Sequence, residues 1–71
     1  MADSVYVVNE IVGTSEKSWE DAAKIAIETA AKSVKDLRIG EVVKQDVTLE
    51  NGKVASYRVR LNVSFKYHPK K

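Results

Sequence analysis

The last third of the chain alternates between apolar and polar residues with a period of two. Such alternation sends each set of side chains to one face of a sheet and predicts a strand from Val54 to Tyr67. The apolar set is Ala55, Tyr57, Val59, Leu61, Val63, Phe65 and Tyr67. Asn51-Gly52, just before this strand, is typical of a two-residue type I′ turn. The turn therefore predicts a hairpin with a preceding strand from about Glu41 to Glu50.

Earlier in the chain the apolar residues recur every three or four positions. This spacing predicts an amphipathic helix from Trp19 to Leu37. Ser15 and Ser18 are both possible N-caps, and Ser18 is favoured because Asp21 lies three residues on and can complete a capping box. The apolar stripe consists of Trp19, Ala22, Ala23, Ala26, Ile27, Ala30, Val34 and Leu37. Since Trp19 belongs to this stripe, we expect it to pack in a core or an interface rather than to stack on a ligand.

The segment before the helix predicts a first strand and a turn. Val5–Val12 has apolar residues on both of its faces, which favours burial on both sides. Gly13-Thr14-Ser15 predicts the turn into the helix. The resulting order is β-α-β-β, an α+β fold in which a three-stranded antiparallel sheet partly wraps one helix. The longest and most regular strand, the last one, is expected at the centre of the sheet.

The predicted elements do not match in length. A helix of about 19 residues spans roughly 28 Å, whereas a straight last strand would span about 45 Å. An apolar strand face that extends beyond the helix needs cover from another subunit. The sequence therefore predicts a homo-oligomer.

Composition narrows the class of protein. The chain has 71 residues, which predicts one domain over 1–71, with an ordered core of about 5–67 and a short polar tail of 68–71. It has no cysteine, so disulfides, thiolate metal sites and cysteine nucleophiles are excluded. Neither a secretory signal nor a membrane-spanning run is visible in the sequence. We therefore expect a soluble, cytoplasmic protein.

The residues that could carry chemistry are scattered. The one histidine, His68, has no serine or cysteine constellation around it and is interpreted as a solvated tail residue. No catalytic residues are predicted, and the protein is not expected to be an enzyme. Acidic side chains could supply oxygen ligands to Ca²⁺ or Mg²⁺, but none has calcium-loop spacing, so the metal ligands stay unassigned. These carboxylates are Glu16, Glu20, Asp21, Asp46 and Glu50.

Taken together, several short segments resemble the dodecin family over about residues 5–66. They are Val12-Gly13-Thr14-Ser15, Ser18-Trp19-Glu20-Asp21-Ala22, Glu41-Val42-Val43, Gly52, Tyr57-Arg58-Val59 and Val63-Ser64-Phe65. The resemblance implies a β-α-β-β subunit, assembly of twelve copies into a hollow sphere, and storage of a flavin such as riboflavin or FMN between subunits.

The resemblance also implies where a flavin would lie. In flavin-binding members a Trp before the second strand stacks on the ring, and the matching position here is Ile39. A Gln early in the last strand bonds the ring in some members, and the matching position is Arg58. Ile39, Gln45 and Arg58 are therefore the candidate flavin-binding residues, and this chain lacks the stacking Trp.

Three hypotheses follow for the ligand. The first is a flavin-binding cage without catalysis. The second is a flavin-free dodecin assembly that holds divalent cations such as calcium at carboxylates that meet between subunits. The third is a nucleic-acid binder that uses Arg58, Arg60 and Lys66. The net charge of only +2 argues against the third, so neither nucleic acid nor a membrane is an expected partner.

Overall fold

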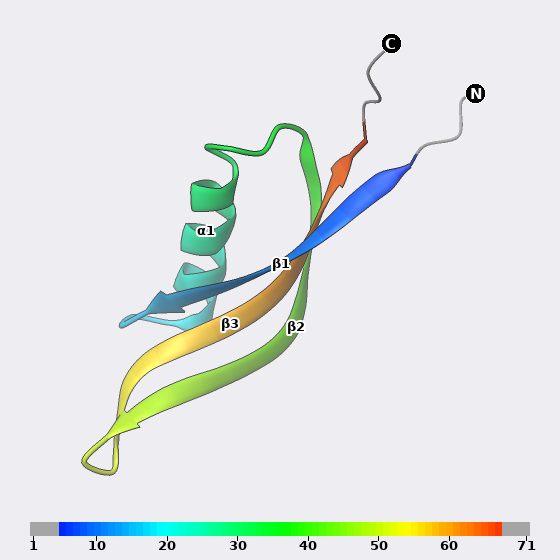
Figure 1. Cartoon of the computed structure of the whole chain (residues 1–71). Helices are drawn as coiled ribbons and strands as arrows, with labels where there is room; N and C mark the ends of the chain where they lie inside the picture. The colour runs from blue at the N-terminus through cyan, green and yellow to red at the C-terminus, as the bar shows by residue number, and fades with distance from the viewer. Residues whose placement is uncertain (1–4, 68–71) are drawn as a thin grey trace.

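The computed structural model describes residues 5–67, so the tail residues His68 and Pro69 lie outside the described part. It has four elements in the order strand, helix, strand, strand (Figure 1). Their bounds are β1 Tyr6–Ser15, α1 Trp19–Ala30, β2 Leu37–Glu50 and β3 Lys53–Lys66. The predicted β-α-β-β order and the α+β class are confirmed.

The three strands form one antiparallel sheet in the order β1-β3-β2, with the last strand at its centre as predicted. Figure 1 shows the twisted sheet with α1 against one of its faces. The turn between β2 and β3 has positive φ at both central residues, 53° at Asn51 and 75° at Gly52. This is the type I′ geometry expected for Asn-Gly, because its twist matches that of the paired strands.

The helix begins where the sequence predicts. The side chain of Ser18 accepts a hydrogen bond from the backbone N–H of Asp21 at 3.0 Å, which satisfies one free donor of the first turn. The carboxylate of Asp21 accepts a 2.7 Å hydrogen bond from Ser15 Oγ. Two acidic residues in the first turn, Glu20 and Asp21, also complement the helix dipole.

The helix ends at Ala30, so the prediction that it continues to Leu37 was wrong. After Ala30 the backbone amides of Lys32 and Ser33 bond carbonyls three residues back, which tightens the last turns. Asp36 then adopts a φ of 65°, which redirects the chain into β2. Leu37 therefore reaches the same core from a strand, and the apolar spacing alone could not distinguish the two positions.

The expected turn at residues 13–15 was also wrong, because Gly13, Thr14 and Ser15 continue β1 and pair with β3. Likewise, β2 begins at Leu37 rather than at Glu41. Gly13 permits β1 to continue past α1 at close range because it has no side chain. A Cβ on Gly13 would collide with the carbonyl oxygen of Ala22 and would lie 2.7 Å from the Cβ of Ala26.

The core is small and lies between α1 and one face of the sheet. Its five buried apolar residues are Ala22, Ala26, Val59, Leu61 and Val63. The last three belong to the apolar set of the alternating strand, so the predicted inward face is confirmed. Within residues 5–67 no helix has the length and apolar character needed to cross a bilayer.

Candidate functional site

The polar set of β3 lies on the sheet face away from α1, which we call the outer face. Antiparallel partners lie directly opposite each other and share a face. The strand register therefore groups the outer-face residues into rows that run across the sheet. The four rows that cross all three strands are Val8–Ser64–Ile39, Glu10–Asn62–Glu41, Val12–Arg60–Lys44 and Thr14–Arg58–Asp46.

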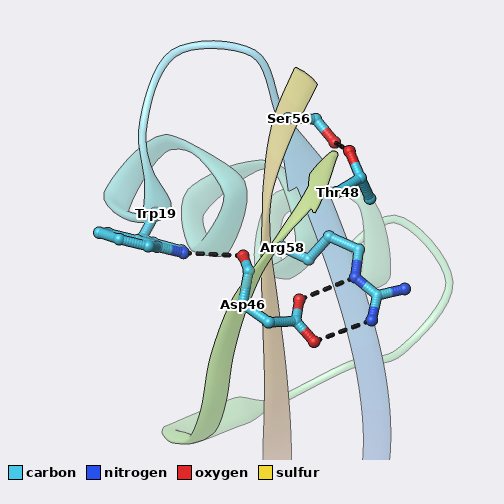
Figure 2. Close-up of polar contacts among 5 residues, drawn as sticks. All are labelled: Trp19, Asp46, Thr48, Ser56 and Arg58. Atoms are coloured by element: carbon cyan, nitrogen blue, oxygen red, sulfur yellow. Dashed lines mark hydrogen bonds and ion pairs between the residues drawn. The ribbon is translucent and has the colours of Figure 1, made fainter. Parts of the chain in front are cut away.

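The row with Arg58 and Asp46 contains a bidentate ion pair. Arg58 Nε and Nη2 each donate a 2.8 Å hydrogen bond to a different carboxylate oxygen of Asp46 (Figure 2). This fork-to-carboxylate geometry is the strongest arrangement for a pair of this kind. The hydrogen bond from Arg58 lowers the pKa of Asp46, helped by the charges of Arg58, Arg60 and Lys44 and opposed by desolvation.

The backbone of β2 at Asp46 is also held from the face of the sheet towards α1. Trp19 Nε1 donates a 3.0 Å hydrogen bond to the backbone oxygen of Asp46 (Figure 2). The indole packs edge-to-face on Tyr57, with ring centroids 5.1 Å apart. Trp19 therefore packs against the sheet beside the core, as the helical stripe predicts, and it fixes β2 next to the ion pair.

The next row carries two cations that face each other. Lys44 and Arg60 are direct partners between β2 and β3. Within residues 5–67 neither has a carboxylate oxygen within 4.0 Å, because the two ion pairs found there join other residues. Both side chains line a shallow hollow together with Val12, Asp46 and Arg58.

The third row carries two acids around an amide. Glu10 of β1 and Glu41 of β2 are both opposite Asn62 of β3. A register shift between Val42 and Lys44 puts an extra residue, Val43, into β2. This bulge places Glu41 on the same face as Lys44, although the two residues are an odd number of positions apart.

These acids were not among the candidate carboxylates from the sequence. Strict alternation along β2 puts Glu41 on the face opposite to Lys44, and no residue in the sequence marks the bulge. The row brings two carboxylates and one amide oxygen to one patch, and these are the hard oxygen ligands that calcium prefers. Within residues 5–67 no three acidic or histidine side chains form a metal group, so ligands from a further copy or water would have to complete such a site.

Two of the acids predicted as possible ligands already have partners within the chain. Asp21 accepts from Ser15, and Asp46 accepts from Arg58. Either acid would have to give up those bonds to bind a cation. The carboxylates of the acidic row, Glu10 and Glu41, have no such ion pair within residues 5–67.

A single chain does not bring the three candidate flavin-binding residues together. Ile39 lies opposite Ser64 on the outer face, whereas Gln45 lies opposite Val59 on the face towards α1. Ser64 is six residues from Arg58 along β3, which corresponds to about 20 Å. Ile39 is 58% exposed. A flavin site that uses these residues would have to form between copies, and the three assignments stay predictions.

The fold and the strand register place this chain in a class of small β-α-β-β proteins in which the helix covers only one face of the sheet. The family model for dodecins matches residues 5–68. The chain therefore belongs to the dodecin family, which confirms the resemblance inferred from its motifs.

Individual relatives agree with this assignment. Calcium dodecin from Mycobacterium tuberculosis is 46% identical over 66 residues, 93% of each chain. A crystal structure of calcium dodecin from that organism, with a novel calcium-binding site, superposes with a TM-score of 0.81 over 96% of this chain and 97% of that one. Dodecin from Streptomyces coelicolor is 30% identical, with a TM-score of 0.92 over 99% of this chain and 100% of its own.

Proposed function

We propose that this protein is a non-catalytic, self-assembling ligand-binding protein, with twelve copies in the complete assembly. The main support is the amount of surface that one chain leaves open. Its accessible area is 5660 Å², whereas a compact monomer of 7.9 kDa would expose about 4,400 Å². Exposed apolar side chains contribute to this area, including Val8 and Ile39 on the outer face. Further copies would cover this surface and stabilise so small a core.

For the ligand, we propose calcium rather than flavin. The acidic row of Glu10, Asn62 and Glu41 offers a hard oxygen donor set, and a relative with 46% identity is a calcium dodecin. In contrast, Ile39 offers no aromatic face for a flavin ring. Arg58, at the other flavin position, already forms two hydrogen bonds with Asp46. The proposed location is the cytoplasm.

The calcium proposal is tested by calorimetric titration of chelator-treated protein with calcium. We expect saturable binding to the wild type. Glu10→Gln and Glu41→Gln should each weaken it about tenfold or more, because each removes one anionic ligand. Glu28→Gln, which removes one charge from an exposed helical position, is the matched control and should bind as the wild type does.

Two outcomes would contradict parts of this proposal. Calcium binding that is unchanged in both row variants would place the metal elsewhere. If calcium does not bind at all, and added riboflavin or FMN instead shows saturable fluorescence quenching, flavin storage replaces the calcium function. In that case Ile39→Ala should weaken quenching, which would assign Ile39 to the flavin site.

A further inference from the structure

We propose that the cationic pair Lys44 and Arg60 is an anion site that binds the phosphate group of a small molecule. The site lies within one chain and does not depend on the calcium function, so the two can be tested separately. Its basis is the arrangement of charges on the outer face.

The first step is the pairing itself. Lys44 and Arg60 are directly opposite each other on adjacent strands. Like charges at such positions destabilise a sheet, because their Cβ atoms are only about 4.5–5.5 Å apart. An anion between them would remove that repulsion.

The second step is that the adjacent carboxylate does not neutralise the pair. Both oxygens of Asp46 accept hydrogen bonds from Arg58 at 2.8 Å, so this carboxylate attracts the two cations of the pair only at longer range and forms no ion pair with either within residues 5–67. In the part of the chain that the structure describes, the other acids next to the pair on this face are Glu10 and Glu41, one row further along the strands. Two residues along a strand correspond to about 7 Å, and neither acid forms an ion pair with Lys44 or Arg60 within residues 5–67.

The third step concerns the size and chemistry of the ligand. The hollow that Lys44 and Arg60 line with Val12 holds only about 10 Å³, so the anion would sit over it rather than inside it. Arginine presents a planar fork that matches phosphate oxygens, and lysine adds a mobile point charge. Arg58, the neighbouring cation of β3 on this face, is bonded to Asp46, and the next one, Lys66, is about 20 Å away, which favours a single phosphate group over a nucleic-acid strand.

The experiment is a ³¹P NMR titration of the assembled, calcium-free protein with inorganic phosphate and with phenyl phosphate at constant ionic strength. We expect saturable binding of both. Arg60→Gln and Lys44→Gln should each weaken it at least about fivefold, and Arg60→Lys should weaken it less than Arg60→Gln, because the charge remains although the planar fork is lost. Lys53→Gln removes one exposed cation from the same strand and should leave binding unchanged.

Three results would overturn the inference. One is the absence of saturable binding to the wild type. Another is equal affinity in Arg60→Gln, Lys44→Gln and Lys53→Gln, which would show only a general charge effect. The third is tight binding of a short single-stranded DNA together with no binding of either phosphate, which would assign this face to nucleic acid. Sedimentation of each variant shows whether it remains assembled, and Arg60→Lys tests the site if a neutral variant does not.

Discussion

At the scale of single residues, α1 can lie close to β1 because Gly13 has no side chain. Gly13 lies in β1 with the carbonyl of Ala22 and the methyl group of Ala26 directly above it. Both alanines are buried, so they have little room to move. Gly40 lies in β2, and a Cβ there would approach only the tip of the Ile27 side chain, at 2.9 Å.

The two glycines therefore predict different costs for the same substitution. Gly13→Ala should destabilise the protein by about 1–3 kcal/mol or more, because the backbone of α1 must move away from β1. Gly40→Ala should cost clearly less, since Ile27 can change its rotamer. Urea denaturation of both variants measures the difference. Equal losses of unfolding free energy would contradict the tight contact at Gly13.

At the scale of elements, β2 and β3 are joined by side chains on the outer face as well as by their backbones. The Asp46–Arg58 ion pair is followed along the strands by a 2.6 Å hydrogen bond between the hydroxyls of Thr48 and Ser56 (Figure 2). Asp46 and Arg58 are 43% and 41% exposed, so solvent weakens the attraction between their charges. The two parallel hydrogen bonds still fix the orientation of the two side chains relative to each other.

This pair predicts a pH dependence with a definite sign. The pKa of Asp46 is lowered from its ordinary value of 3.8, so the folded state favours the charged form. Its contribution to stability is therefore present above that value and is lost as the pH falls through the folded-state pKa, below about pH 4. Thermal unfolding of wild type and Asp46→Asn should differ at pH 7 and converge towards pH 2. A difference that stays constant over this range would contradict the assignment.

Periodicity in the sequence predicted the strands, the hairpin, the N-cap and the central place of β3, because these depend on local pattern and turn chemistry. It could not predict where the helix ends, since Leu37 suits a helical stripe and a strand equally well. It also could not predict the acidic row. That row depends on a bulge at Val43 and on the pairing of residues that are far apart in the sequence. The local sequence predicts neither feature.

At the scale of the whole molecule, one chain is a long sheet that the short helix α1 covers only in part. It extends 54 × 20 × 15 Å. The helix of 12 residues spans about 18 Å and the central strand of 14 residues about 46 Å, so the mismatch exceeds the one expected from the sequence. The strands also carry exposed apolar residues that α1 does not cover, among them Val8 and Ile39 on the outer face and Leu49 near the hairpin.

Charging one of these residues should separate assembly from folding. Val8 is 56% exposed and lies in the apolar outer-face row with Ile39. We expect Val8→Asp to lower the mass measured by native mass spectrometry while the circular dichroism spectrum stays that of a folded chain. Lys24→Glu, at an exposed position on α1, is the control. An unchanged mass for Val8→Asp would remove this row from the interface.

The bulge in β2 also governs how this chain tolerates changes in length. Deleting Val43 would remove the bulge, so Val42 and Lys44 would become chain neighbours opposite Leu61 and Arg60, and Glu41 would stay on the same face as Lys44. Deleting Val42 as well would instead turn the part of β2 before it over relative to β3. Glu41 would then face the helix, and the backbone at Gly40 would no longer face Ile27. We therefore expect the loss of one residue at this point to be tolerated far better than the loss of two.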